Sequence, residues 1–547
     1  MSDFRAAWNA VTERRPLSGR ELAIAWLGLA VLCALAFAPN VMHGGFYLDD
    51  WSNGATSIQP KGGPGLGNTL SIFADEGIYR PLLVLWVPVT FGLFGLDTGL
   101  HQALAASLAL VVAGLLYGIL RTLGVPRLHA WIVAGLTLVY PWYDSTRLWS
   151  TADQVTLGIA LAAAGLWIAL VGLSRRSWRW HAVAAVLYLM AILTYEVALP
   201  LIAVLGALYT VRAGWRAARV RWAVDLAMVA IGGLWVGTQT QRTKAGPGGS
   251  LDHLAEIVER GAEIAGRSVV PVGPTRTTLG VCALLGTIVL AAALYAWLPT
   301  RFAERERSWG LRGWLLLAGG GLLVTVLGWV IYIPADPYYT PSIYGITNRV
   351  NGLAGIGLVV AAYGALGIVG ALLGQLLPRV RALPVIVTLV LAAVLGATYA
   401  QVLRRHAHIW HTAYAAERAG LARIKAEFPD FPRGTTLFVS GYPANQTLGV
   451  PIFSSDWDVW GMIKLEYEDW TLDAFPVIYG TRLACLPDGI RLQGKGLREG
   501  TKELVPYGKA QLFDFVTGSQ ARPRNPRECR AVVGTYVPGP LYLSSEY

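Results

Sequence analysis

The feature that most constrains this chain is a series of long apolar stretches separated by short polar loops. A helix needs about 20 apolar residues to cross the hydrocarbon core of a bilayer. The stretches predict about eleven membrane spans, although those at 130–140, 182–193 and 197–211 are short for a full crossing. The predicted spans lie near Leu22–Ala38, Leu100–Leu120, Ala130–Tyr140, Gln154–Leu173, Ala182–Leu193, Val197–Val211, Ala223–Gln239, Leu279–Leu298, Trp314–Ile333, Leu353–Leu373 and Leu383–Val402.

The composition supports a polytopic α-helical membrane protein. Of the 547 residues, 54% are hydrophobic and 14% are charged, whereas a soluble protein carries about 25% charged residues. The net charge is +11, but the basic residues are scattered between apolar stretches instead of forming a stripe with interleaved aromatics. The charge therefore fits membrane topology and argues against a nucleic-acid-binding protein.

Charge in the loops predicts the orientation. One set of loops is rich in arginine, and it includes Arg14, Arg15, Arg20, Arg121, Arg127, Arg175, Arg176, Arg179, Arg212, Arg216, Arg219, Arg221, Arg301, Arg305, Arg307, Arg312, Arg379 and Arg381. The alternate loops hold Asp49, Asp50, Asp75, Glu76, Asp97, Asp144 and Asp336. The positive-inside rule places the first set and the N-terminus in the cytoplasm and the second set outside, in a multi-pass protein of the cell (plasma or inner) membrane.

The interval from Leu82 to Leu96 is apolar but is interrupted by Pro88, Gly92 and Gly95. It is either one half of a tight hairpin of two spans or a helix that lies flat in the interface. The interfacial helix preserves the alternation of charge in the later loops, and we therefore favour it.

The sequence divides into a transmembrane domain, residues 1–403, and a domain of different composition, residues 404–547. In the second, Trp410, Tyr414, Leu421, Ile424 and Phe428 recur at helical spacing. Turn clusters separate predicted strands at Thr435–Ser440, Phe475–Tyr479, Leu512–Val516 and Ala531–Val537. These patterns predict a small extracytoplasmic α+β domain.

The cysteines fall into two groups. Cys485 and Cys529 lie in the predicted outer domain, where they form either a disulfide bond or two free thiols. Cys33 and Cys282 lie in predicted spans, which is typical of small apolar packing residues.

Asp49 and Asp50 follow the first predicted span. Each carboxylate would cost roughly 2.5–3.5 kcal/mol at the centre of a bilayer, so the pair should lie at the outer interface. A base at this position can meet both a lipid-borne and a water-borne substrate. Arg80, in the same loop, is either a ligand for a lipid phosphate or an ordinary headgroup anchor.

Aromatic residues accompany arginine in two further outer loops. Trp142 and Tyr143 lie in one, and Tyr338, Tyr344 and Arg349 lie in the other. Aromatic faces bind the C–H face of a sugar and Arg349 would bind a phosphate; an aromatic belt at the interface is the alternative.

Glu196 lies between two closely spaced apolar stretches and is either a functional carboxylate near membrane depth or part of a surface turn. Of His406, His408 and His411, only the last two share a helical face. A solvated interfacial cluster is therefore expected instead of a metal site, and the sequence contains no other metal-binding motif or cofactor signature.

The order of these motifs resembles the GT-C superfamily of membrane glycosyltransferases, especially protein O-mannosyltransferases and their bacterial relatives, including aminoarabinose transferases. The resemblance covers roughly Leu22 to Leu205. The motifs that carry it are Asp49-Asp50, Tyr79-Arg80-Pro81-Leu82, His101, Trp149-Ser150-Thr151-Ala152-Asp153 and Glu196-Val197-Ala198-Leu199-Pro200. Tyr195 departs from the pattern, because that branch often has lysine before the glutamate.

The resemblance implies an inverting hexosyl- or pentosyltransferase that moves a sugar from a polyprenyl-phosphate donor to a glycan, lipid or protein acceptor outside the membrane. It implies that Asp49 is the base and that Asp50 orients or binds the acceptor. Arg80 and Arg349 would hold the donor phosphate. Substrate contacts are expected from Tyr79, His101, Trp142, Tyr143, Asp153, Glu196, Tyr338 and Tyr344. No metal or other cofactor is required, because the arginines stabilise the leaving phosphate.

Two other functions are compatible with such a sequence. A lipid-linked polysaccharide polymerase or ligase would use basic residues in a large loop between late spans, whereas the loop that contains Arg349 is short. A transporter or flippase for lipid-linked sugars would show charges within spans or repeated halves. Asp225 is one of few such charges, and no repeat is evident.

Overall fold

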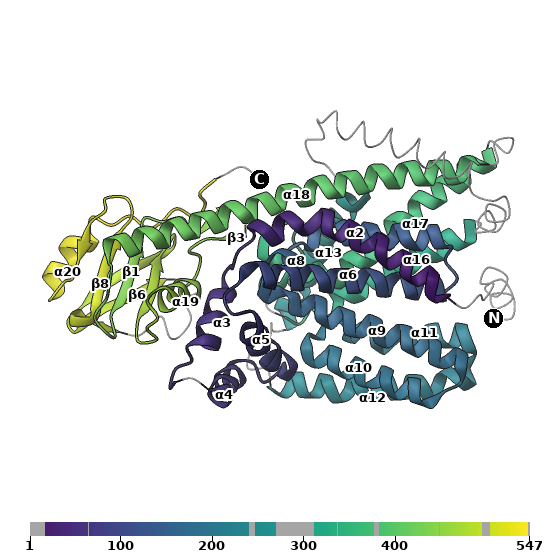
Figure 1. Cartoon of the computed structure of the whole chain (residues 1–547), viewed down its shortest axis with the longest axis horizontal. Helices are drawn as coiled ribbons and strands as arrows, with labels where there is room; N and C mark the ends of the chain where they lie inside the picture. The colour runs from purple at the N-terminus through teal and green to yellow at the C-terminus, as the bar shows by residue number, and fades with distance from the viewer. Residues whose placement is uncertain are drawn as a thin grey trace.

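The computed structural model describes residues 17–63, 65–239, 247–269, 311–335, 337–376, 382–447, 449–494 and 504–544. A bundle of long helices is joined at one end to a smaller region of helices and strands (Figure 1). The longer helices are α2 (Gly19–His43), α3 (Asp49–Ile58), α4 (Leu66–Gly77), α5 (Pro81–Phe94), α6 (Thr98–Thr122), α7 (Arg127–Val139), α9 (Asp153–Arg175), α10 (Trp178–Thr194), α11 (Leu199–Ala213), α12 (Trp215–Gln239), α13 (Pro247–Val269), α16 (Leu311–Val330), α17 (Gly352–Leu376), α18 (Leu383–Glu427), α19 (Asp456–Tyr467) and α20 (Pro526–Val533). The short helical turns are η1 (Pro141–Tyr143), α8 (Ser145–Leu148), η2 (Ser150–Ala152), η3 (Glu196–Ala198), η4 (Pro337–Tyr339), η5 (Gly345–Asn351) and η7 (Tyr507–Lys509).

Eight helical segments in the described part of the chain are long and apolar enough to cross a membrane. They are Gly19–His43, Thr98–Thr122, Ser150–Arg175, Glu196–Ala213, Trp215–Gln239, Leu311–Val330, Gly345–Leu376 and Leu383–Glu427. Each overlaps one of the eleven predicted spans, and all but Leu311–Val330, which ends before the predicted Ile333, contain the whole span. The predictions at 130–140 and 182–193 correspond to shorter apolar helices, α7 and α10, and the prediction at 279–298 lies outside the described residues. The chain is therefore a multi-pass membrane protein.

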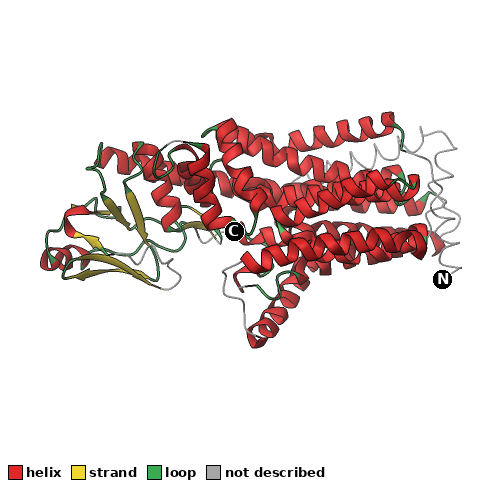
Figure 2. Cartoon of the chain, turned by 90° about the horizontal axis from the view of Figure 1, so that it is seen from below, coloured by secondary structure: helices red, strands yellow, loops and turns green. Residues whose placement is uncertain are grey.

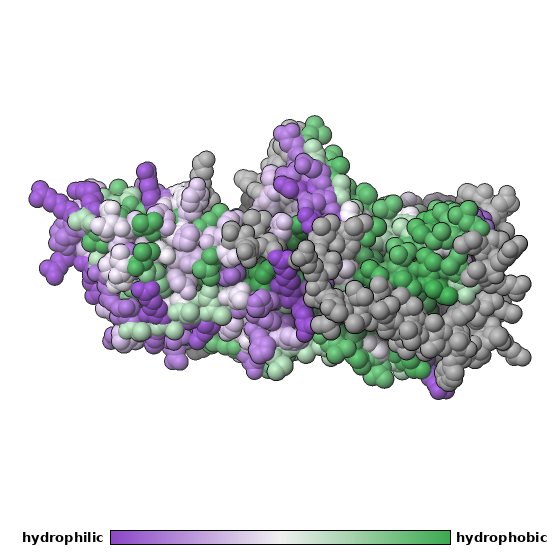
Figure 3. Space-filling model, turned by 90° about the horizontal axis from the view of Figure 1, so that it is seen from above, coloured by the Kyte–Doolittle hydropathy of each residue, from purple (hydrophilic) through white to green (hydrophobic). Residues whose placement is uncertain are grey.

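The surface of the bundle is apolar, as expected for helices that face lipid. Figure 3 shows apolar residues over the bundle and mainly polar residues over the C-terminal region. Large exposed apolar side chains on the bundle include Leu27, Leu35, Leu234, Leu323 and Val326.

The two classes of loop lie at opposite ends of the bundle. Near the start of α2, Glu21 pairs with Arg121 at the end of α6 (2.7 Å) and Arg127 at the start of α7 (2.9 Å). The other end carries Asp49, Asp50 and the C-terminal region (Figure 1). Arg121 and Arg127 therefore lie at the end of the bundle opposite to the acidic pair. Several of the arginines (14, 15, 301, 305, 307, 379 and 381) and Asp336 lie outside the described residues, and the side of the membrane stays a prediction.

The interval Leu82–Leu96 forms one short helix, α5, in place of a hairpin of two spans. Pro81 occupies its first turn, and Gly95 ends it with a φ of 56°, which favours glycine. Its 14 residues correspond to about 21 Å, less than the thickness of the hydrocarbon core. Figure 1 shows α5 beside α3 and α4 at the end of the bundle near the C-terminal region, which fits the predicted interfacial helix.

Helix α18 joins the two parts of the molecule without a break. It has 45 residues and is about 68 Å long. Its buried face continues into the C-terminal region with Leu403, Trp410, Ala413, Leu421 and Ile424. The predicted domain boundary at residue 404 therefore falls within a continuous helix.

Among its described residues, the C-terminal region contains three small sheets, whose strands lie at one end of the molecule (Figure 2). The largest has the strand order β4-β1-β8-β9: β1 is parallel to both β4 and β8, and β9 is antiparallel to β8. A second, antiparallel sheet has the order β5-β6-β7, and β2 pairs with β3. The strands are β1 (Thr436–Ser440), β2 (Asn445–Thr447), β3 (Val450–Pro451), β4 (Asp473–Val477), β5 (Thr481–Leu486), β6 (Gly489–Gly494), β7 (Val505–Pro506), β8 (Ala510–Asp514) and β9 (Gln520–Ala521).

The predicted α+β class is confirmed, and three predicted strands correspond to β1, β4 and β8. The strand predicted at 531–537 is wrong, because 526–533 form α20. Asn525 caps this helix by accepting hydrogen bonds from the backbone N–H groups of Arg527 and Glu528, and Pro526 occupies its first turn. The Asn525 cap and Pro526 favour a helix here, and they prevail over the preference of the following β-branched residues for a strand.

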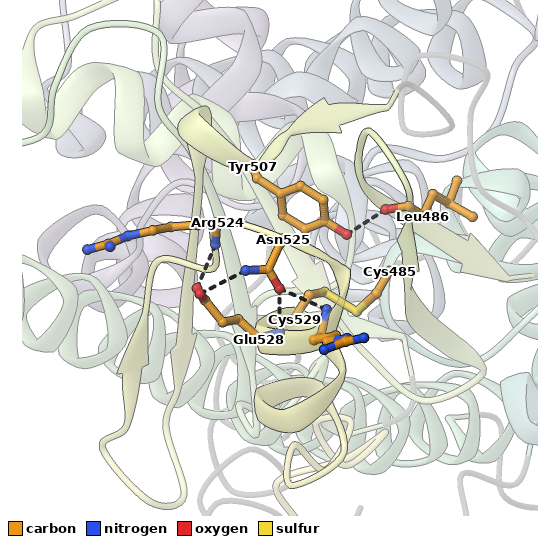
Figure 4. Close-up of a disulfide and its surroundings, with 8 residues drawn as sticks. Cys485, Leu486, Tyr507, Arg524, Asn525, Glu528 and Cys529 are labelled. Carbon is orange, nitrogen blue, oxygen red and sulfur yellow. Dashed lines mark hydrogen bonds between the residues drawn. A yellow bond between two sulfur atoms is a disulfide. The ribbon is translucent and has the colours of Figure 1, made fainter.

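Cys485 and Cys529 form a disulfide bond that connects β5 to α20 (Figure 4). The same view shows the Asn525 cap and the hydroxyl of Tyr507, which donates to the carbonyl of Leu486. Cys33 is buried as predicted, with its Sγ 3.4 Å from the carbonyl oxygen of Ala106. Cys282 lies outside the described residues.

Loss of the disulfide should destabilise the C-terminal region. The bond spans 44 residues, for which chain entropy gives about 4 kcal/mol. We expect the double variant Cys485→Ser/Cys529→Ser to be cleaved faster in this region during limited proteolysis, whereas Cys33→Ala should be cleaved there at the wild-type rate. Equal protection of the double variant and the wild type would contradict this role.

Candidate active site

The acidic pair begins α3 after a strained turn. The backbone N–H of Asp50 donates to the carbonyl of Tyr47 at 3.0 Å, and Leu48 between them has φ 49° and ψ −113°. A positive φ is unfavourable for leucine and costs about 1–3 kcal/mol, which the surrounding contacts must offset. Asp49 is half-buried, whereas Asp50 is fully buried. The two adjacent carboxylates therefore have different access to solvent.

Asp50 connects α3 to η2. Its Oδ1 accepts hydrogen bonds from the backbone N–H of Thr151 at 2.7 Å and the Thr151 hydroxyl at 2.5 Å. Its Oδ2 accepts from the backbone N–H of Tyr47 at 3.0 Å. Both oxygens of this buried carboxyl group are therefore engaged by hydrogen bonds from neighbouring residues.

Burial raises the pKa of Asp50 to about 7. Removal of the carboxylate from water disfavours its charged form, and the neighbouring Asp49 acts in the same direction. The hydrogen bonds from Thr151 and Tyr47 favour the charged form and partly oppose the shift. Asp50 therefore titrates near neutral pH.

Arg80 and Glu196, predicted separately, form one ion pair. Arg80 Nε lies 2.9 Å from Glu196 Oε2, and Nη2 lies 2.7 Å from Oε1, so the pairing is forked. The guanidinium of Arg80 also lies 4.0 Å from the ring centre of Tyr195 and 5.1 Å from that of Tyr79. Arg80 is only 6% exposed, so its orientation is fixed.

Arg349 lies in a second group of aromatic rings. Its guanidinium carbon is 5.3 Å from the ring centre of Trp149, 5.4 Å from Tyr338 and 5.6 Å from Tyr339. Its Nη1 donates to the carbonyl of Ile346 at 2.8 Å.

The two guanidinium groups belong to one cluster. Tyr195 lies within electrostatic range of both Arg80 and Arg349. The structure thus brings together Tyr79, Arg80, Glu196, Tyr338 and Arg349 from segments far apart in the sequence. Tyr344 lies in the same loop as Arg349, where its backbone N–H bonds to the hydroxyl of Ser342.

The segment from Trp149 to Asp153 links this cationic cluster to the acidic pair. Trp149 lies beside Arg349, and Thr151 is bonded to Asp50. Asp153 Oδ1 accepts a hydrogen bond from the indole of Trp86 on α5 at 3.0 Å. The linking role of Thr151 was not predicted, although the residue lies in a motif that the sequence already marked.

Three residues predicted to contact the substrate, His101, Trp142 and Tyr143, are buried. The imidazole Nε2 of His101 lies 3.1 Å from the carbonyl oxygen of Gly95, and the ring packs on Phe46 and Phe91. Trp142 and Tyr143 are buried in the core of the bundle. The hydroxyl of Tyr143 donates to the carbonyl of Thr137 at 2.6 Å.

The solvated histidine cluster is a wrong prediction for His406. This residue is buried, and its Nδ1 lies 2.6 Å from Asp144 Oδ2. The other oxygen of Asp144 accepts from the amide of Asn348 at 2.5 Å. His406 lies one helical turn before Trp410 on the buried face of α18, a signal that was available in the sequence.

The other two histidines of this group, His408 and His411, differ in their exposure to solvent. His408 is exposed, whereas His411 is half-buried, with its Nε2 3.1 Å from Asn40 Oδ1. Among the described residues, no group of three or more His, Cys, Asp or Glu side chains is arranged to hold a metal ion.

No family model matches the sequence, and no curated protein matches it. The chain is structurally similar to the crystal structure of ArnT from Cupriavidus metallidurans bound to undecaprenyl phosphate. The match covers 78% of this chain and 83% of that chain, with 17% sequence identity and a TM-score of 0.35.

The pKa of Asp50 predicts a dependence of stability on pH. The pKa is about 7 in the folded protein and 3.8 as the ordinary value, so the stabilising contribution is complete below pH 4 and is lost as pH rises through 7. Asp50→Asn cannot titrate. The melting temperature of the wild type relative to this variant should therefore fall between pH 5 and pH 8, as measured in detergent. A difference that does not change with pH would show that Asp50 does not titrate in this range.

Proposed function

We propose that the chain is a GT-C-type glycosyltransferase that moves a sugar from a polyprenyl-phosphate donor to an acceptor hydroxyl on a glycan, lipid or protein outside the membrane. One observation carries the proposal. A half-exposed carboxylate, Asp49, and two guanidinium groups are held in one frame through Asp50, Thr151 and Trp149. This frame supplies a base and a site for a departing phosphate, at the end of the bundle that carries the predicted outer loops.

Asp49 is the proposed general base. Its carboxylate accepts the proton of the acceptor hydroxyl while the hydroxyl oxygen attacks the anomeric carbon of the donor. General-base assistance contributes about 10²–10⁴-fold to such a step. Attack from the face opposite the phosphate forms the new glycosidic bond as the sugar–phosphate bond breaks, and the configuration inverts.

Arg80 and Arg349 are the proposed ligands of the leaving phosphate. Charge-assisted hydrogen bonds from guanidinium groups stabilise negative charge as it develops on the phosphate oxygens. Glu196 fixes the orientation of Arg80 through the forked ion pair. The rings of Tyr338 and Tyr339 beside Arg349 provide flat surfaces on which a sugar can pack.

An apolar cavity within the bundle fits the lipid part of the donor. Its volume is about 360 Å³, and its walls are formed by residues of α6, α9, α10, α11, α16 and α17. Side chains that line it include Leu116, Leu166, Leu205, Leu316 and Ile356. A prenyl chain is wholly apolar and would be held in such a cavity by van der Waals packing against these side chains.

Asp49→Asn tests the base. The substitution preserves the shape of the side chain and removes its charge, so transfer should fall by about 10²–10⁴-fold while donor binding persists. Transfer of labelled sugar to an acceptor would be measured with purified protein in detergent. Asp75→Asn, an exposed carboxylate in the same predicted loop, should retain wild-type turnover. Normal turnover by Asp49→Asn would exclude Asp49 as the base.

Arg80→Lys tests the phosphate site. Lysine keeps the charge but cannot reproduce the forked geometry, so the affinity for a polyprenyl-phosphate donor should fall by about tenfold or more. Arg418→Lys, a half-exposed arginine on α18, is the matched control and should bind like the wild type. Unchanged affinity in Arg80→Lys would leave Arg80 as a headgroup anchor.

A further inference from the structure

The helix that carries the acidic pair, α3, packs between α18 and α19 of the C-terminal region. On one side, the hydroxyl of Tyr47 donates to the carbonyl of Trp410 at 2.9 Å. The indole of Trp51 donates to Glu417 Oε2 at 3.3 Å. On the other side, α19 approaches so closely that a Cβ atom at Gly461 would lie 2.5 Å from the carbonyl carbon of Trp51. Figure 1 shows α3 beside α19.

Glu417, on the α18 side of this contact, is a buried carboxyl group with few hydrogen bonds. Its side chain is fully buried on α18. Oε2 accepts the single hydrogen bond from Trp51, and Oε1 has no protein partner among the described residues. An ionised carboxylate with so few hydrogen bonds would be very costly to bury.

The groups that face Glu417 add to this cost. Asp458 on α19 and Asp50 on α3 lie within electrostatic range, and both are fully buried carboxyl groups. Further titratable groups of the described residues that lie within electrostatic range of it include Tyr47, Tyr414, Tyr442 and Arg418. One arginine that is 50% exposed does not balance three buried acids. Glu417 is therefore expected to carry a proton.

We propose that Glu417, as a neutral carboxylic acid, is a positioning residue for the acidic pair. By holding the indole of Trp51, it fixes the first turn of α3, in which Asp49 and Asp50 immediately precede Trp51. This inference rests on the proposed function, because it assigns Asp49 and Asp50 to the reaction. The C-terminal region would then help to position the residues that carry out the reaction.

The strained turn before Asp49 explains why such an anchor is needed. Leu48 adopts a positive φ, so the turn persists only while its surroundings hold it in place. The contacts to Trp410, Glu417 and Gly461 all come from outside the loop that contains the acidic pair. Loss of one of them would let the first turn of α3 relax and would move Asp49.

Two substitutions of Glu417 distinguish a role in positioning α3 through the hydrogen bond to Trp51 from a role in filling space. Glu417→Gln is neutral and keeps an oxygen for Trp51, so its kcat should remain within about twofold of the wild type. Glu417→Leu fills the space but cannot accept the hydrogen bond. Its kcat should fall by on the order of tenfold with little change in the KM for the donor. Glu466→Gln on α19, whose weak ion pair with Arg418 measures 3.8 Å, is the control and should behave like the wild type.

Trp51→Phe should reproduce the effect of Glu417→Leu, because it removes the other partner of the same hydrogen bond. The double variant should be no worse than either single variant, since the two act as one unit. Additive losses would show that Trp51 and Glu417 act independently and would overturn the proposal. Equal losses in Glu417→Gln and Glu417→Leu would overturn it as well, because a neutral acceptor would then not suffice.

Hydrogen–deuterium exchange provides a readout that needs no substrate. In Glu417→Leu, the amides of the first turn of α3 should exchange about tenfold faster than in the wild type, while those of the membrane helices remain unchanged. Glu417→Gln should exchange like the wild type. If the wild type shows no sugar transfer but the exchange pattern holds, the proposed function fails and the anchor stands. If Glu417→Leu exchanges its amides at the wild-type rate and keeps the wild-type kcat, Glu417 does not position α3. The proposed glycosyltransferase function would be unaffected by that result.

Discussion

The hydrogen bonds between Asp50 and Thr151 hold the candidate site together. They join two segments 101 residues apart in sequence, and each partner carries further parts of the site. Asp50 belongs to the helix that presents Asp49. Thr151 lies between Trp149 and Asp153. Trp149 contacts Arg349, and Asp153 accepts a hydrogen bond from a residue of α5. The first turn of α5 follows Arg80. A single buried carboxylate thus sets the relative positions of the acidic and cationic groups.

The local parts of this structure could be read from the sequence. Length and hydropathy located the spans, because a bilayer imposes one length on every helix that crosses it. Alternation and turn residues located β1, β4 and β8. The hairpin of β5 and β6 was missed, although Pro487-Asp488-Gly489 marks its turn. At α20, the Asn-Pro start of a helix competed with β-branched residues, and the cap decided the outcome.

The contacts that define the site could not be read in this way. Arg80 and Glu196 are 116 residues apart, and Asp144 and His406 are 262 residues apart. No local pattern specifies which buried charges will meet, since the answer depends on the packing of whole helices. The motifs predicted that Asp49, Arg80 and Glu196 lie near the outer interface. They did not show that one carboxylate of the acidic pair is buried, or that the C-terminal region touches the helix that carries it.

The continuity of α18 has a mechanical consequence. About 25 of its residues extend beyond the predicted span, which gives a lever arm of about 37 Å. A helix without a hinge transmits its direction, so each degree of tilt in the last span displaces the far end by about 0.6 Å. The tilt of a span follows the thickness of the surrounding bilayer. A change in the tilt of the last span would therefore displace the part of α18 that contacts α3, on which the geometry of the acidic pair depends.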